Sequence, residues 1–182
     1  PLGNDHEVLT GNVSSIASTN AVYDNELEIF TTDMAASTLG SGALLSTDGK
    51  IVGLMLPSIN ESSMLRAVKI SQVEGIIKDI LRGKELPYLG MKISTLDEQT
   101  ARDVSMPRGV YVSLVAYDSP AMEGSVKSGD VITKIGDTYI NSADDYEKQL
   151  SSLSKGESVD VTFMRLASSG VYEEIECTLI VG

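Results

Sequence analysis

The chain has 182 residues, of which 42% are hydrophobic and 22% are charged, a composition typical of a globular protein rich in turns. Its net charge of −12 would repel a phosphate backbone, which argues against nucleic-acid binding. The single cysteine excludes an internal disulfide, and one cysteine with one histidine cannot form a zinc site, so we expect no metal and no cofactor.

The first part of the chain, residues 1–70, is expected to form about five short β-strands. Residues 25–32 alternate between two faces, which is the period of a half-buried strand. The turn at Thr47-Asp48-Gly49 predicts a hairpin, because glycine adopts positive φ without steric cost. The predicted strands cover residues 7–10, 13–16, 25–32, 42–46, 50–56 and 65–70.

Helical periodicity replaces this pattern over residues 71–83. Ser71 and Glu74 have the spacing of a capping box, and the apolar residues that follow recur every three or four positions. Gly83 is a natural helix end. We therefore expect residues 71–87 to be a linker helix and boundary between two domains.

The second part, residues 88–182, predicts strands mixed with short helices. Residues 109–115 alternate, with Val110, Val112 and Leu114 on one expected face. Ser142, with Asp145 three residues later, predicts the start of a helix. The predicted strands are 89–93, 109–115, 130–135, 158–165 and 173–181, and the predicted helical segments are 96–104, a turn from 119, and 142–153.

A serine within a glycine-flanked turn marks the first part. Residues 32–45 read Thr-Asp-Met-Ala-Ala-Ser-Thr-Leu-Gly-Ser-Gly-Ala-Leu-Leu, and Ser41 falls eight positions after Asp33. This segment resembles the nucleophile loop of trypsin-fold serine proteases of the HtrA/DegP type, and residues 48–53 match the turn and strand that follow it. The resemblance implies that residues 1–70 are part of the second β-barrel of such a protease, that Ser41 is the catalytic nucleophile, and that Asp33 is structural.

The same resemblance places the oxyanion donors at the backbone N–H groups of Leu39 and Ser41. The family usually has glycine where this chain has Leu39, so a side chain restricts the backbone at that position. His6 is the only histidine, and the family takes its catalytic histidine and aspartate from the first barrel, upstream of Pro1. A serine without a base is a poor nucleophile, so we expect this chain alone to be inactive.

Two hypotheses for the parent protein stay open. One is an active serine endopeptidase of protein quality control, favoured by Ser41 in register with the family motif. The other is a pseudoprotease that serves as a peptide-binding scaffold or sensor, favoured by Leu39 and the substituted loop. Labelling of Ser41 by a fluorophosphonate probe would separate them.

The second part carries a different set of motifs. Tyr88-Leu89-Gly90-Met91 resembles the carboxylate-binding loop of the PDZ domains in HtrA-type proteases. Residues 119–132 resemble the signature Ser-Pro-Ala, two residues, Gly-Leu, two residues, Gly-Asp-Val-Ile, with one additional residue between the two glycines. The resemblance covers residues 88–182 and implies one PDZ domain, a five- to six-stranded partly open barrel with two helices.

A PDZ domain binds an extended peptide as an additional strand. The backbone N–H groups of Leu89, Gly90 and Met91 would hold a terminal carboxylate. The pocket would be lined by Leu89, Met91 and the helix residues Tyr146 and Leu150, although this pair equally fits core packing at i and i+4, and Tyr88 completes the loop. The resemblance therefore implies extended or unfolded polypeptides and carboxyl-terminal peptides as partners, and an extracytoplasmic location. A homo-oligomer could form through amino-terminal parts that this chain lacks or through an unpaired sheet edge.

Overall fold

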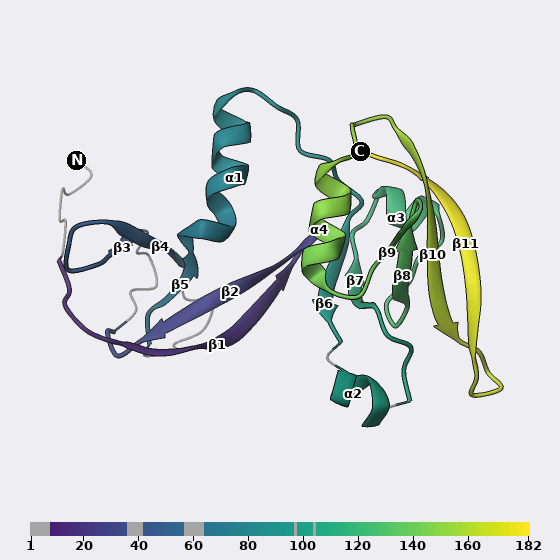
Figure 1. Ribbon diagram of the computed structural model, residues 1–182, viewed down its shortest axis with the longest axis horizontal. Helices are drawn as coiled ribbons and strands as arrows, with labels where there is room; N and C mark the ends of the chain where they lie inside the picture. The colour runs from purple at the N-terminus through teal and green to yellow at the C-terminus, as the bar shows by residue number, and fades with distance from the viewer. Residues whose placement is uncertain (1–7, 36–41, 57–63, 97, 104) are drawn as a thin grey trace. The chain divides into compact units, whose positions relative to one another are not determined.

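The computed structural model describes residues 8–35, 42–56, 64–96, 98–103 and 105–182 (Figure 1). The chain forms two compact units. The first comprises the described parts of Pro1–Asn20 and Leu27–Lys78, and the second comprises Ala21–Glu26 and Asp79–Gly182. Within the described residues, every helix is too short or too polar to cross a lipid bilayer.

The first unit is built on a curled five-stranded sheet with the order β1-β2-β5-β4-β3. Strands β2, β5, β4 and β3 pair in antiparallel fashion. Ile29, Ala67 and Val68 are buried on this sheet. The strands are β1 (Val13–Val22), β2 (Asn25–Thr32), β3 (Ala43–Leu45), β4 (Ile51–Leu56) and β5 (Arg66–Lys69).

The start of β1 corrects one prediction. Residues 8–12 form no strand in the described part of the expected segment 7–10, and β1 instead runs on to Val22. Asn12 donates its backbone N–H to Asp33 Oδ1 (2.7 Å) and accepts the Asp33 N–H at its own carbonyl (3.1 Å). These bonds use the backbone groups of Asn12 outside a regular ladder, so the strand begins after it.

Helix α1 (Ile70–Leu81) follows β5 without a connecting loop. Its type and length agree with the helix predicted over 71–83, but the predicted cap is wrong, because Ser71 lies inside the first turn. Lys78 forms an i,i+4 ion pair with Glu74 (2.6 Å). All residues of α1 are described and none is buried, so the apolar stripe of this helix does not contribute to a core here.

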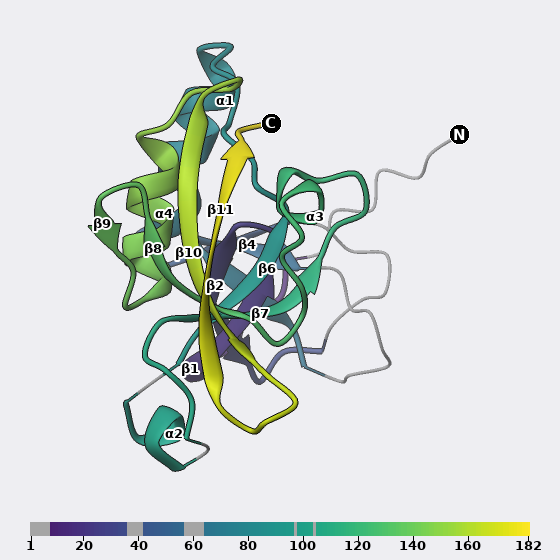
Figure 2. The same cartoon turned by 90° about the vertical axis from the view of Figure 1, so that its right-hand side faces the viewer.

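The second unit contains a six-stranded antiparallel sheet with the order β11-β10-β8-β7-β6, and β9 pairs with β8. Strands β10 and β11 form a long hairpin (Figure 2), and α4 lies alongside β6 (Figure 1). The strands are β6 (Met91–Thr95), β7 (Val110–Val115), β8 (Val131–Ile135), β9 (Thr138–Tyr139), β10 (Ser158–Leu166) and β11 (Tyr172–Ile180). The helices are α2 (Glu98–Asp103), α3 (Pro120–Glu123) and α4 (Ala143–Ser151), which lie at the three predicted helical segments and are one more than the resemblance implied.

The core of the second unit is aliphatic, with Tyr146 and Phe163 as its largest members. Helix α4 buries Ala143, Tyr146 and Leu150, which share one face at a spacing of three and four residues. Ser142 is the N-cap of α4, as predicted, and its Oγ accepts the N–H of Asp145 (3.2 Å). This helix therefore has one fixed face toward the sheet.

A β-bulge in β7 corrects the predicted face of Leu114. Lys92 is opposite Leu114 but Ile93 is opposite Val112, so one additional residue is inserted in β7. The insertion reverses the alternation after Val112. Leu114 is 46% exposed, while Val115 packs against the core.

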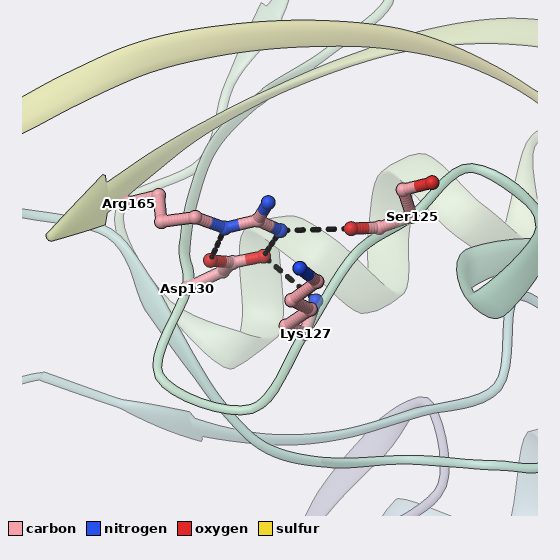
Figure 3. A network of polar contacts seen from close by, with 4 residues as sticks. All are labelled: Ser125, Lys127, Asp130 and Arg165. Carbon is pink, nitrogen blue, oxygen red and sulfur yellow. Dashed lines mark hydrogen bonds and ion pairs between the residues drawn. The ribbon is translucent and has the colours of Figure 1, made fainter. Parts of the chain in front are cut away.

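An ion pair with a buried carboxylate fixes the loop before β8 (Figure 3). The Arg165 guanidinium donates from Nε to Asp130 Oδ1 and from Nη2 to Asp130 Oδ2, both at 2.7 Å. Nη2 also donates to the carbonyl of Ser125 (2.8 Å), and the N–H of Lys127 donates to Asp130 Oδ2 (2.8 Å). Ser125 has a φ of 63° in this loop, and Val126 after it is buried. Arg165 thus holds the loop in which this chain has one residue more between two glycines than the signature that residues 119–132 resemble.

Candidate functional site

The predicted nucleophile Ser41 and the predicted oxyanion residue Leu39 lie outside the described residues. The chain just before them is anchored. Thr32 is fully buried and both its N–H (3.0 Å) and its Oγ1 (3.1 Å) donate to the carbonyl of Leu65. The exposed Asp33 carboxylate accepts the backbone N–H and the side-chain amide of Asn12, which lower its pKa. Asp33 therefore joins the end of β2 to the segment before β1 through its hydrogen bonds with Asn12.

The predicted carboxylate-binding loop, residues 88–91, leads into β6 and is held by its carbonyl groups. Three carbonyls of the loop each accept a hydrogen bond from another part of the second unit. This arrangement fixes the peptide planes and directs the N–H groups to the opposite side. The donors are Gly182 N to Tyr88 O (2.9 Å), Ala121 N to Leu89 O (3.0 Å) and Ala116 N to Gly90 O (2.8 Å).

Gly90 is required by this geometry. Its φ is 86°, in the left-handed region that L-residues with a side chain rarely adopt. A Cβ on Gly90 would also collide with the Cβ of Ser119, the residue that caps α3. Two independent constraints therefore demand glycine at the centre of the loop.

The N–H groups of this loop converge on one carboxylate, that of Asp24. Leu89 (2.9 Å) and Gly90 (2.8 Å) donate to Asp24 Oδ2, and Met91 donates to Oδ1 (3.2 Å). The phenol of Tyr146 also donates to Oδ1 (2.5 Å). Asp24 is 8% exposed. The loop is thus an anion-binding site made of neutral donors, and it is occupied by a side chain of the second unit.

Burial controls the protonation of these groups. Burial raises the pKa of the Asp24 carboxyl, and the hydrogen bonds from Tyr146 and the three N–H groups only partly oppose that rise. Burial and the nearby Asp24 charge raise the pKa of the Tyr146 phenol well above its ordinary value. Burial also raises the pKa of Tyr88. Tyr146 therefore remains a hydrogen-bond donor across the physiological pH range.

The residues around Asp24 extend the sheet at the edge of β6. The N–H of Asp24 donates to Met91 O (2.6 Å), and Tyr23 forms an antiparallel bridge with Lys92. The Lys92 ammonium lies 5.3 Å from the ring centroid of Tyr23. The segment Ala21–Glu26, which we call the hairpin tip because it joins β1 to β2, therefore pairs with the edge of β6 through one antiparallel bridge and one backbone hydrogen bond.

Two further hydrogen bonds hold the hairpin tip beyond Asp24. Thr95, at the end of β6, donates its N–H to Glu26 Oε2 (2.8 Å). Glu26 donates its own N–H to Glu147 Oε1 on α4 (3.3 Å). Both β6 and α4 therefore contact the tip.

The predicted site residues differ in where the structure places them. Leu89 and Met91 are fully buried and belong to the core through their side chains, while their N–H groups face the Asp24 carboxylate. Leu150 is in the core, and Tyr146 is in the core and at the site. Asp24 was not among the predicted residues. Its sequence signal is only that of a polar turn before β2, which says nothing of what the turn contacts.

Comparison with known proteins identifies a family for the second part of the chain and relatives that cover most of the chain. The model of the PDZ domain matches residues 87–177. The chain is 26% identical to a probable periplasmic serine protease do/HhoA-like of Haemophilus influenzae, over 91% of this chain and 38% of that protein. It is 27% identical to the serine protease Do-like HtrA of Bacillus subtilis, over 91% of this chain and 42% of that protein.

A solved structure supports the fold. The HtrA-type protease AlgW with tripeptide is 22% identical and matches with a TM-score of 0.57, covering 100% of this chain and 62% of that one. The chain spans less than half the length of the two curated relatives above. The chain belongs to the PDZ-domain family, and it is HtrA/DegP-like over most of its length.

Proposed function

We propose that residues 88–182 bind extended polypeptides by their free carboxyl terminus. The terminal carboxylate would accept the N–H groups of Leu89, Gly90 and Met91, and the preceding residues would pair with β6. One observation carries this proposal: these three N–H groups converge on a carboxylate whose own backbone pairs with the same strand.

The donor set explains the selectivity that we expect. The hydrogen bonds to the loop carbonyls fix the N–H groups, so these groups can donate to an anion without rearranging, and the Tyr146 phenol adds a fourth donor. An amidated terminus carries no charge and would direct N–H groups at other N–H groups. Tyr88 and Leu150 would border the side chain of the last peptide residue.

For the parent protein, the proposal is an HtrA-like serine endopeptidase of the extracytoplasmic space, in which residues 1–70 belong to the catalytic unit, 71–87 connect, and 88–182 present substrate. Ser41 would be the nucleophile, with the N–H groups of Leu39 and Ser41 as oxyanion donors. Support comes from the names of the relatives, which are serine proteases and in part periplasmic. The 182-residue chain alone is expected to be inactive, because its single histidine has no family counterpart as a base.

A pseudoprotease is the second candidate for the parent, favoured by the side chain of Leu39 at an oxyanion position. A fluorophosphonate probe applied to the longest natural form of the protein tests it. Labelling that disappears in Ser41→Ala supports the protease, and an absence of labelling supports the pseudoprotease.

The peptide-binding proposal is tested by fluorescence polarisation with ten-residue peptides that end in an apolar residue. Each peptide is made with a free and with an amidated terminus. The assay uses the whole 182-residue chain with Asp24→Asn, so that the resident carboxylate does not mask binding. We expect the free form to bind at least about tenfold more tightly, because a hydrogen-bonded charge contributes roughly 1.5–3 kcal/mol.

Two glycine variants in the same background control for the loop. Gly90→Ala should abolish binding, since it adds both backbone strain and the collision with Ser119. Gly129→Ala carries comparable strain, with a φ of 96°, but its added Cβ meets nothing within 4 Å, so binding should persist. Equal affinity for free and amidated peptides would refute the proposal.

A further inference from the structure

We propose that the hairpin tip is a tethered competitor for the peptide site. It occupies the carboxylate-binding loop as an internal ligand, so that a peptide carboxyl terminus binds only when the tip has left. This inference rests on the proposed peptide-binding function and specifies how that same site is regulated.

The hairpin tip follows the course expected of a bound peptide end. From Val22 through Tyr23 to Asp24 the chain runs antiparallel to β6, and it reaches the loop with a carboxylate. In Asp24 this carboxylate belongs to the side chain, whereas a peptide would offer its terminal group. The tip can therefore make the contacts of a carboxyl terminus from within a continuous chain.

The backbone of Asp24 makes this substitution possible. Its φ is 58°, a left-handed conformation that aspartate and asparagine adopt more readily than most residues. This turn leads the chain away from the loop and into β2 at Asn25. Without it, the chain would continue into the loop that receives the carboxylate.

Occupancy by the tip and by a peptide is mutually exclusive. Each of the three loop N–H groups has one hydrogen, and all three are directed at Asp24. The carbonyl of Met91, which a pairing peptide would need, accepts the N–H of Asp24. A second carboxylate at these neutral donors would face the charge of Asp24 at close range, which is unfavourable.

Residues on both sides of Asp24 also contact the rest of the second unit, so the tip is held by more than the hydrogen bonds of Asp24. Tyr23 contacts Lys92 before it, and Glu26 contacts Thr95 and Glu147 after it. The tip thus contacts the edge of β6 and the amino acid side chains of α4, the two elements that a PDZ ligand engages.

The tether determines how strongly the tip competes. Because the tip and the loop belong to one chain, docking of the tip is an intramolecular step, and its effective concentration decides how strongly it competes with a free peptide. The apparent affinity for a peptide is then reduced by the fraction of molecules with a free site. Coupling of this kind typically changes affinity about 5- to 150-fold.

Asp24→Asn in the whole chain tests the proposal. Asparagine retains the size of the side chain and its tolerance of positive φ, but it replaces one of the two acceptor oxygens with an NH2 group, which faces N–H or O–H donors and cannot accept from them. We expect the free-carboxyl peptide to bind at least about fivefold more tightly to Asp24→Asn than to the unmodified chain, as coupled sites do. Asp137→Asn, at an exposed turn residue of the same unit, is the charge-matched control and should leave affinity unchanged.

A second measurement is independent of any loss of folding. In two-dimensional NMR, the amide signals of Leu89, Gly90 and Met91 should move on Asp24→Asn without peptide, and peptide added to the unmodified chain should move the amide of Asp24. Equal peptide affinity of the two forms, with unmoved Asp24, overturns the competitor and leaves the proposed function intact. Binding by neither form overturns the proposed function, and the competitor with it.

Discussion

Two buried aspartates of the second unit are held in opposite ways. Asp130 is 1% exposed and faces a guanidinium, that of Arg165, with one backbone N–H in addition. Asp24 is 8% exposed and faces only neutral donors, three N–H groups and one phenol. One carboxylate is neutralised by an opposite charge, and the other is solvated by dipoles.

This difference separates a structural carboxylate from an exchangeable one. Arg165 lies on β10 and Asp130 directly precedes β8, and the hydrogen bonds and charge of Asp130 raise the pKa of the guanidinium, so Arg165 keeps its charge. The pKa of Asp24 is also raised, because its donors compensate burial incompletely. A site of fixed dipoles discriminates little between one carboxylate and another, so a ligand can replace Asp24 but not Asp130.

Arg165→Met should have the largest effect on stability. It would leave the Asp130 charge buried and without its cation, which costs about 3–5 kcal/mol in comparable pairs. Because the Arg165 side chain is itself 26% exposed, water can reach part of the site and we expect the lower end of this range. Urea unfolding of the whole chain, followed by far-ultraviolet circular dichroism because the chain has no tryptophan to report by fluorescence, measures the change.

The matched control is Arg102→Met on α2. Arg102 forms an i,i+4 ion pair with Glu98 (3.4 Å) in which both side chains are more than 60% exposed. Such a pair contributes roughly 0.3–0.5 kcal/mol. If both arginine variants lose the same stability, Asp130 does not depend on its cation and the contrast with Asp24 fails.

Tyr146→Phe should have an intermediate effect, because it removes the phenol donor from Asp24 and leaves the ring in the core. We expect a loss of about 1.5–3 kcal/mol, the range for a hydrogen bond to a charged group. Combined with Asp24→Asn in a double-mutant cycle, it should give a coupling energy of about 1 kcal/mol or more. Tyr139→Phe, at a residue that is 74% exposed, is the control. A coupling energy of zero would mean that the tip is not docked in solution.

Local signals in the sequence predicted most of the fold. The cap at Ser142, the strand over residues 25–32 and the glycine turn at Gly49 depend on neighbours within a few positions, and all three are present in the structure. They specify strands and helices because side-chain period and backbone freedom act over a few residues.

The errors arise where a distant residue decides. Leu114 changes face because of a bulge in a strand pair, and residues 8–12 are held outside the sheet by the contact of Asn12 with Asp33. Asp24 is 66 residues from Gly90 in the sequence, and no pattern around Tyr23 indicates that this turn would meet a loop so far along the chain. The motif at 88–91 predicted a carboxylate site, but not which carboxylate occupies it. The roles of Leu39 and Ser41 remain predictions.

The smallest expected effect is a dependence of tip docking on pH. The docked Asp24 has a raised pKa, so the docked state binds a proton more tightly than the undocked state. Docking is therefore strongest below the ordinary pKa of aspartate, and it weakens as the pH rises through the raised value. Tyr146 and Tyr88 face the same carboxylate but remain neutral throughout this range because their pKa values are raised.

Glu147 must be separated from this effect, because burial raises its pKa too and it contacts the N–H of Glu26 in the tip. In a Glu147→Gln background, the Gly90 amide signal should still shift with pH as Asp24 ionises, and peptide affinity should increase from pH 4 to pH 7. With Asp24→Asn added, both should become flat. A pH dependence that survives the loss of both carboxyl groups would mean that neither controls the tip. The exchangeable carboxylate would then be another residue. The pH dependence of docking must come from the group whose pKa differs between the docked and the undocked state, and that group is the one that the N–H and phenol donors hold.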